Sequence, residues 1–202
     1  ALNDGTADKI RALADELAES YVPVDVQEDF IDPTALFNIG YGLYVVTSKD
    51  QDKDNGLIVN TVTQVTNTPN RVAVTINKMN YSCDVIAKTG VLNISTLSEE
   101  APFKLFEHFG FQSGRNTDKF ADINTPTDIN GIPYLGWQTC ALLSCKVVNS
   151  IELGSHTLFI AEVIDGKVLS ENAPLTYADY QNKVKPKPEQ KIEEKEIVGW
   201  IL

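Results

Sequence analysis

The stretch Gly56–Ser82, GLIVNTVTQVTNTPNRVAVTINKMNYS, decides the fold class of this chain of 202 residues. In Arg71–Asn77 every second side chain is Val or Ile, and this period of two predicts a β-strand with one buried face. The turn-forming run Asn67–Asn70 separates this strand from the alternating polar and apolar residues Asn60–Thr66. The stretch is therefore expected to form strands joined by a tight turn.

Similar patterns continue on both sides of this stretch. Tyr41–Thr47 and Leu57–Val62 flank the polar run Lys49–Gly56, whose final Asn-Gly predicts a β-hairpin. Further elements are expected as a short helix over Asp84–Lys88 ended by Gly90, a strand over Val91–Leu97, a helix over Glu99–Phe109, and strands over Cys140–Val148 and Thr157–Ile164. Many short strands with few helices favour a closed or nearly closed barrel. The sequence has no G-x-G-x-x-G motif, which disfavours a Rossmann nucleotide site.

The two ends of the chain differ from its middle. Residues 1–32 are expected to form a helical N-terminal extension, because Ile10, Leu13 and Leu17 recur at helical spacing. Residues 33–181 form the main domain, and 182–202 a linker-like C-terminal tail. The tail begins with a run, 182–196, of prolines and alternating charges that is typical of a solvated linker.

Charge and composition exclude several classes of function. The formal net charge is −11, from 17 basic and 28 acidic residues, so a nucleic acid would be repelled on average. No run approaches the roughly 18–20 apolar residues of a membrane span, and the start lacks the apolar core of a signal peptide. The three cysteines form no C-x-x-C pair, so we expect inert thiols in a reducing cytoplasm and no metal site.

Two segments within Asn60–Ser82 carry the side chains best suited to bind a ligand. The strand Asn60–Gln64 presents neutral hydrogen-bonding groups that suit a heteroaromatic ligand, although an exposed strand rich in Thr would have the same composition. The turn Asn77–Ser82 precedes a predicted helix, and helix N-termini attract phosphate. Lys78 adds a charge there, and Ser82 is a candidate N-cap.

Several long motifs resemble those of a known family. They are the runs FNIGYGLYVV (37–46), GLIVNTVTQV (56–65), PNRVAVTINKMNYS (69–82), FEHFGFQSGR (106–115) and GSHTLFIAEV (154–163). They are similar to flavin reductase-like proteins with the FMN-binding split-barrel fold, especially flavoredoxin and the flavin domain of high-molecular-weight rubredoxin. The resemblance covers about residues 34–188. It implies a mainly β fold, an FMN-binding split β-barrel with a few short helices.

The resemblance also implies a homodimer that holds one FMN per subunit near the interface. The residues expected to line the flavin ring are Asn60, Thr61, Val62, Thr63 and Gln64. Those expected at the phosphate are Asn77, Lys78 and Ser82, with Arg115 supplying charge toward the flavin or phosphate and Lys119 as a lesser candidate. Gly114, before Arg115, would allow the backbone to approach the ligand closely.

Two histidines need separate interpretations. His156 follows Ser155, at a position where relatives usually carry an acidic residue that could orient the ring. His156 is the candidate catalytic residue at the flavin, and a structural role is the alternative. His108, on the predicted aromatic helix, is expected to be structural.

The implied activity is an oxidoreductase that takes a hydride from NAD(P)H onto FMN and passes electrons to free flavin, a rubredoxin or another redox protein. Two alternatives stay open: an electron-transfer flavoprotein without significant NAD(P)H activity, and a non-enzymatic flavin-binding module. In the rubredoxin-type relatives an iron-binding module would begin near Gly199, and no cysteine ligands follow in this sequence. Electrons are therefore expected to leave to a separate acceptor.

Overall fold

The computed structural model describes residues 8–9, 11–16 and 32–187 in two units, Ala1–Ile39 and Gly40–Leu202. In the first unit, residues 8–9 and 11–16 are helical, and the 3-10 helix η1 spans Pro33–Asn38. Asp32 caps η1 by accepting a hydrogen bond from the backbone N–H of Thr34 at 2.9 Å. Two positions that predicted the first helix, Ile10 and Leu17, lie outside the described residues, as do residues 188–202 of the predicted tail.

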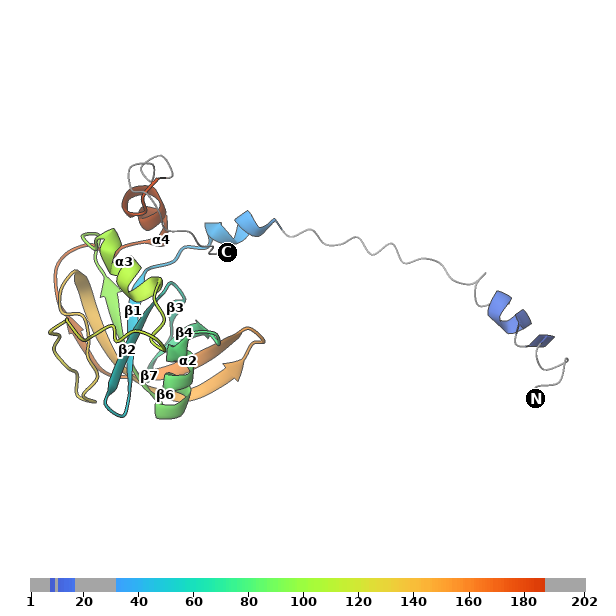
Figure 1. Cartoon of the computed structure of the whole chain (residues 1–202), viewed down its shortest axis with the longest axis horizontal. Helices are drawn as coiled ribbons and strands as arrows, with labels where there is room; N and C mark the ends of the chain where they lie inside the picture. Colours follow the sequence, from blue (N-terminus) through green and yellow to red (C-terminus); the bar gives the residue numbers. More distant parts are fainter. Residues whose placement is uncertain (1–7, 10, 17–31, 188–202) are drawn as a thin grey trace. The chain divides into compact units, whose positions relative to one another are not determined.

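One antiparallel sheet of seven strands forms the second unit (Figure 1). Its strands are β1 (Tyr44–Asp50), β2 (Lys53–Val59), β3 (Val62–Asn67), β4 (Asn70–Asn77), β5 (Val91–Leu97), β6 (Thr139–Glu152) and β7 (His156–Val168). Their order in the sheet is β2-β1-β5-β6-β7-β4-β3. The sheet therefore places β2 and β3, which follow each other in the sequence, at its two opposite edges.

This order requires a strongly curled sheet. Only Asn60 and Thr61 connect β2 to β3, so the Cα atoms of Val59 and Val62 lie at most about 11 Å apart. Six strand spacings would separate the same two edges by roughly 29 Å if the sheet were flat. The edges must therefore meet at this corner, and the predicted mainly β split barrel is confirmed.

The first hairpin differs from the prediction. Its turn is formed by Gln51 and Asp52, with Gln51 in the left-handed region at φ 54°, and the Asn55-Gly56 pair lies inside β2. The predicted strand Leu57–Val62 is also interrupted, because β2 ends at Val59. Tertiary packing agrees with the shift: a Cβ on Gly56 would lie 3.1 Å from the Phe109 ring, a tight contact that favours a residue without a side chain at this position.

The helices lie near their predicted places. α2 (Tyr81–Thr89) packs against β1, β2 and β4 and ends at Gly90, whose φ of 70° is left-handed. α3 (Phe103–Gly110) packs against β2 and begins four residues later than predicted, because Pro102 disfavours a helical residue before it. The chain ends its described part with α4 (Tyr177–Asp179) and the π-helical turn η2 (Tyr180–Val184).

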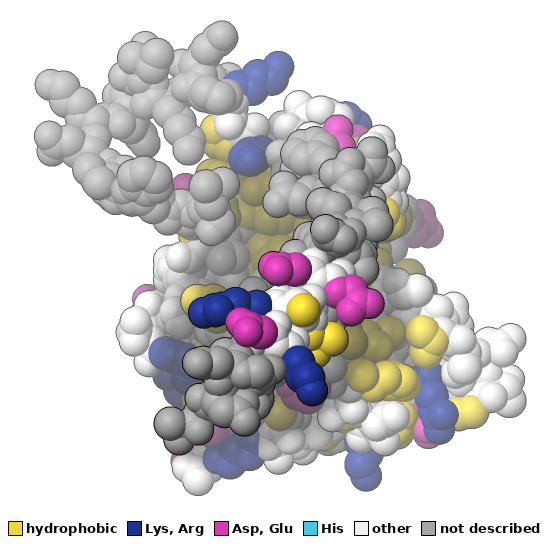
Figure 2. All heavy atoms as spheres, turned by 90° about the vertical axis from the view of Figure 1, so that its right-hand side faces the viewer, with side chains coloured by type: hydrophobic (Ala, Val, Ile, Leu, Met, Phe, Trp, Pro, Cys, Tyr) yellow, Lys and Arg dark blue, Asp and Glu magenta, His cyan; other side chains and the backbone are white. Residues whose placement is uncertain are grey.

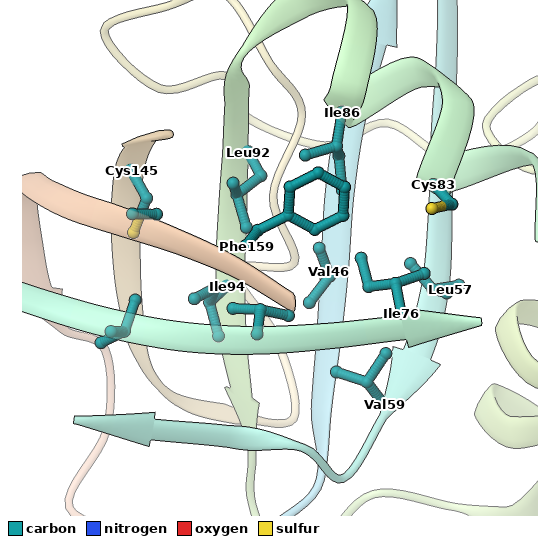
Figure 3. Packing of buried hydrophobic residues seen from close by; sticks show 13 residues of the cluster. Val46, Leu57, Val59, Ile76, Cys83, Ile86, Leu92, Ile94, Cys145 and Phe159 are labelled. Atoms are coloured by element: carbon teal, nitrogen blue, oxygen red, sulfur yellow. The ribbon is translucent and has the colours of Figure 1, made fainter. Parts of the chain in front are cut away.

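Two hydrophobic clusters stabilise this unit. In the first, shown in Figure 3, the Phe159 ring lies beside Ile86 of α2, and the two side chains are 1% and 0% exposed. The second cluster joins α3 to the C-terminal helices through Phe106 and Tyr180. Apolar side chains also reach the surface, and Figure 2 shows some of them in yellow on one face of the molecule. On β6 and β7 they include Val148, Ile151 and Ile164.

The irregular segment between α3 and β6 is held by buried polar side chains of the sheet. Thr47 donates a hydrogen bond to the Pro133 carbonyl at 2.5 Å, and Asn93 donates to the Ile132 carbonyl at 3.1 Å. These bonds satisfy polar groups that would otherwise be costly to bury.

In the ranges that the structure describes, no helix combines the length and apolar character needed to cross a membrane.

Candidate functional site

A polar cavity of about 80 Å³ lies where α2, β2 and the segment after α3 meet. Its lining residues are Asn55, Leu57, Ile58, Asn80, Tyr81, Ser82, Phe109, Gly110, Gln112, Ser113, Gly114 and Lys119. The first N–H groups of a helix have no partner within the helix. The N-cap of α2, Asn80, makes no side-chain capping bond, so this N-terminus keeps free donors beside the cavity. The cavity therefore has the features of an anion site.

Ser82 contributes a hydroxyl group rather than a cap. The prediction that it caps α2 is wrong, because the preceding turn closes at Asn80 and Ser82 is already the second helical residue. Its side chain is buried, and its Oγ accepts a hydrogen bond from Asn55 Nδ2 at 2.5 Å. On the other side of Asn55, a Cβ on Gly114 would lie 1.9 Å from Asn55 Oδ1. Asn55 thus fixes the start of α2 against the Gly114 backbone.

Lys119 places a cation at this cavity. The residue is 3% exposed, and its Nζ donates to the carbonyl oxygens of Gly56 at 2.7 Å and Phe109 at 2.9 Å. Burial lowers the pKa of the Lys119 ammonium to about 8, because a buried charge is poorly solvated. In the described part of the chain no ion pair joins Lys119 to a carboxylate. The ammonium group is thus available to an anion.

Two more cations flank the cavity at Tyr81. Lys53 Nζ lies 5.1 Å from the centre of the Tyr81 ring, and the guanidinium carbon of Arg115 lies 5.3 Å from it. Arg115 also donates to Asp84 Oδ2 at 2.6 Å. The predicted charge of Arg115 therefore lies close to the cavity, partly neutralised by Asp84.

An aromatic cavity of about 330 Å³ adjoins the polar one, since both are lined by Ile58 and Gly110. Its lining residues are Leu43, Ile58, Val59, Asn60, Phe106, Gly110, Phe111, Tyr177 and Tyr180. The rings of Phe106 and Tyr180 lie 4.3 Å apart. A mostly apolar cavity of this size with a few polar groups is typical of a site for a heteroaromatic ligand.

The structure does not gather the five predicted ring-lining residues in one cavity. Asn60 lines the aromatic cavity, whereas Gln64 lines a separate cavity of about 470 Å³ on β3, β4, β6 and β7. Thr61 Oγ1 donates to the Thr75 carbonyl at 2.6 Å, and Val62 packs against the first hydrophobic cluster. Thr63 is exposed. The alternation along a strand and the corner at 60–61 spread these side chains in different directions.

The remaining predicted residues meet at the turn between β6 and β7. Asn77 of β4 pairs with His156, the first residue of β7, and Asn77 Oδ1 accepts a bond from the Met79 N–H at 2.9 Å. Lys78 forms an ion pair with Glu152. Ser155 Oγ lies 2.8 Å from His156 Nδ1. Asn77, Lys78 and His156 line none of the three cavities, so the structure separates them from Ser82.

The sequence interpretation did not include Asn55, which lines the polar cavity together with Ser82 and Lys119. Asn55-Gly56 was interpreted as a turn because that dipeptide is the usual hairpin signal. A two-residue turn at Gln51 leaves Asn55 inside a strand, and only then does its amide reach Ser82. The sequence signal available for this contact was the Gly114-Arg115 motif, because a glycine permits the close approach of a neighbouring group.

The cysteines do not contribute a reactive group to this site. Cys83, Cys140 and Cys145 are free and buried. Burial raises the pKa of the Cys145 thiol to about 12, and the negative charge of Asp128 adds to the effect. A thiol with this pKa is not a nucleophile near neutral pH.

Comparison with known proteins shows the family of this chain. The family model for the flavin reductase like domain matches residues 36–185. High molecular weight rubredoxin of Moorella thermoacetica is 42% identical over 150 residues, which cover 74% of this chain but only 66% of that protein. Ferric-chelate reductase (NAD(P)H) of Archaeoglobus fulgidus is 37% identical over 150 residues, 74% of this chain and 89% of that protein.

A solved structure supports the fold. Flavoredoxin from Methanosarcina acetivorans aligns with a TM-score of 0.59 over 67% of this chain and 74% of its own, at 21% sequence identity. This likeness concerns the fold alone. Together with the curated relatives it confirms the family and the relatives that the sequence motifs indicate.

Proposed function

Because the chain belongs to the flavin reductase-like family, we propose that it is an oxidoreductase that binds FMN and passes electrons from NAD(P)H to an acceptor. The observation that carries this proposal is the pair of adjoining cavities. One is polar and lies at a helix N-terminus beside a buried lysine, and the other is aromatic and includes Asn60. These are the two environments that the phosphate and the ring of FMN need.

The residues fit such a cofactor in the following way. Ser82 and the start of α2 would hold the phosphate, with Arg115 beside Tyr81 adding positive charge. Asn60 would meet the ring at the corner between β2 and β3. When bound, FMN supplies the hydride and electron chemistry, so the protein contributes binding, orientation and electrostatics. No protein nucleophile is required for this reaction.

The proposal also includes three residues that line neither of the two cavities, namely Asn77, Lys78 and His156. Asn77 ends β4 beside His156, the first residue of β7, and Lys78 begins the turn that leads into α2 and shares its charge with Glu152. The His156 ring is hydrogen-bonded to Ser155, with 2.8 Å between Ser155 Oγ and His156 Nδ1. The other ring-lining candidates, Thr61, Val62, Thr63 and Gln64, would act through the backbone of the corner and β3.

The assembly and the partners are proposed as well. Exposed apolar side chains on β6 and β7 support a homodimer, and three buried free cysteines fit a reducing cytoplasm. The donor is NAD(P)H. The acceptor is free flavin, a rubredoxin or another redox protein, and the name of the Archaeoglobus relative adds a ferric chelate to the acceptors worth testing.

The test combines spectroscopy and kinetics on the purified protein. We expect the visible absorbance of oxidised flavin after incubation with FMN and gel filtration, followed by anaerobic bleaching with NADH or NADPH. Reoxidation is then measured with free flavin, rubredoxin and a ferric chelate in separate assays. A protein that binds FMN but is not reduced by either nucleotide would be an electron-transfer flavoprotein. A protein that stays colourless refutes the proposal.

A further inference from the structure

We propose that Asn55 is a positioning residue for the phosphate group of the flavin. Its side-chain amide donates to Ser82 Oγ, and it thereby leaves the Ser82 hydroxyl proton free to donate into the polar cavity. This inference rests on the proposed function and deepens it, since it names a residue that acts through Ser82. The effect of Asn55 is limited to flavins that carry a phosphate group, because riboflavin has no charged group to place in that cavity.

The direction of the Asn55–Ser82 hydrogen bond decides what Ser82 offers the cavity. A serine hydroxyl has one donor proton and two acceptor lone pairs. Asn55 Nδ2 donates to Ser82 Oγ at 2.5 Å, so this contact uses a lone pair of Oγ and not the proton. Asn55 is 1% exposed and Ser82 is 3% exposed, so both side chains are buried. A buried hydroxyl proton needs an acceptor.

Helix α2 does not supply that acceptor. A serine or threonine inside a helix can donate to the carbonyl four residues earlier, as Thr89 does to the Val85 carbonyl at 2.9 Å. Ser82 is only the second residue of α2, so no helical turn precedes it. Within residues 8–9, 11–16 and 32–187, no protein group accepts a hydrogen bond from the Ser82 hydroxyl. The acceptor is therefore expected in the cavity that Ser82 lines.

The packing around Asn55 holds its amide in this orientation. Asn55 lies inside the β1–β2 ladder, and the carbonyl of the next residue, Gly56, accepts a hydrogen bond from Lys119 Nζ at 2.7 Å. On the far side of the amide, a Cβ on Gly114 would lie 1.9 Å from Asn55 Oδ1. The side chain is thus enclosed between the Gly114 backbone and Ser82, and the donor to Ser82 Oγ is fixed before any ligand binds.

The freed proton completes a set of donors. Asn80 makes no side-chain capping bond, so the first N–H groups of α2 stay available beside Ser82. A phosphate dianion offers only acceptors, so a hydroxyl binds it as a donor. If the group at position 55 were an acceptor, the Ser82 proton would turn to it and the hydroxyl would present a lone pair to the phosphate. Asn55 therefore makes Ser82 a donor.

The experiment is a double-mutant cycle with two ligands that differ by one phosphate. Dissociation constants of FMN and riboflavin are measured by flavin fluorescence quenching for the wild type, Asn55→Ala, Ser82→Ala and the double variant. The matched control is Asn93→Ala. Asn93 is also a buried asparagine of the sheet, it donates to the Ile132 carbonyl at 3.1 Å, and it lines neither of the two cavities.

We expect Asn55→Ala to bind FMN about tenfold more weakly, the lower end of the range for a hydrogen bond to a charged group, and riboflavin within about twofold of the wild type. In the Ser82→Ala background the same substitution should change FMN affinity by less than about twofold, because the hydroxyl through which Asn55 acts is gone. Asn93→Ala should keep the wild-type preference for FMN over riboflavin.

The outcomes separate this inference from the proposed function. A wild type that binds neither flavin refutes the function itself. If the wild type prefers FMN but Asn55→Ala costs as much FMN affinity without the Ser82 hydroxyl as with it, Asn55 has a structural role only and the inference alone is wrong. An equal loss of both flavins in Asn55→Ala overturns it as well.

A second variant covers the case in which Asn55→Ala fails to fold. Asn55→Asp keeps the shape of the side chain, but its carboxylate can only accept the Ser82 proton. This variant should lose FMN and keep riboflavin. If Asn55→Asp binds FMN as tightly as the wild type, or loses both flavins equally, the inference is overturned.

Discussion

Replacing Gly114 by Ala tests whether Asn55 organises the polar cavity. The new Cβ would lie 1.9 Å from Asn55 Oδ1, far inside van der Waals contact, so the Asn55 side chain must move. Asn55 is 1% exposed and its amide donates to Ser82 Oγ, so moving it leaves two buried polar groups without partners. Each such group costs about 1–3 kcal/mol. We expect Gly114→Ala to lower the free energy of unfolding by about 3 kcal/mol, or the melting temperature by about 6–12 °C.

The assay is thermal and urea unfolding of the apoprotein, followed by circular dichroism. Gly136→Ala is the matched control, because the nearest atom to its added Cβ is a Pro126 carbon at 3.5 Å, an ordinary contact. That variant should stay within about 0.5 kcal/mol of the wild type. The same Gly114 substitution is then made in an Asn55→Ala background, where the carbonyl oxygen that it displaces is gone. Its cost must fall there, because contacting residues are energetically coupled.

Two results would refute the reasoning. One is a Gly114→Ala protein as stable as the Gly136→Ala control. The other is an equal cost of Gly114→Ala with and without the Asn55 amide, which would place the strain at another neighbour such as the Tyr81 ring at 3.2 Å.

Three further predictions concern packing, charge and pH. Phe159→Ala, at a side chain that is 1% exposed, should cost about 3–5 kcal/mol in urea unfolding, whereas Phe111→Ala, 53% exposed, should cost less than about 1 kcal/mol; equal costs would contradict the assigned core. Lys78→Ala should weaken FMN binding by less than about tenfold, because its partly exposed charge is shared with Glu152, and a much larger loss would make Lys78 a principal phosphate ligand. Since the pKa of Lys119 is lowered to about 8, its charge is present below that pH and lost above it. Because the phosphate of FMN is a dianion above about pH 6, FMN affinity should be nearly constant between about pH 7 and 8 and fall above pH 8, whereas a parallel fall for riboflavin would contradict this reasoning.

The secondary structure followed from local patterns wherever those patterns were long. Arg71–Asn77 became β4 with one added residue, because alternating Val and Ile can bury one face only as a strand. Gly90 ended α2 as expected, since its backbone is left-handed. The failures came where tertiary contacts overrode a local signal. Asn55-Gly56 has the sequence of a turn but lies in β2, because Phe109 and Ser82 require those two residues there.

The sequence by itself determined the strand-rich fold class and the flavin reductase-like family, because strand periodicity and family motifs are local properties of the chain. Only the tertiary structure decided which polar residues share a cavity. Ser82 meets Asn55 and Lys119 across 27 and 37 positions of sequence, while Lys78, four residues from Ser82, turns to Glu152. Burial and pairing of charge depend on elements that are distant in the sequence. Which charged side chains line the polar cavity is therefore decided only once β2, α2 and the loop after α3 have packed together.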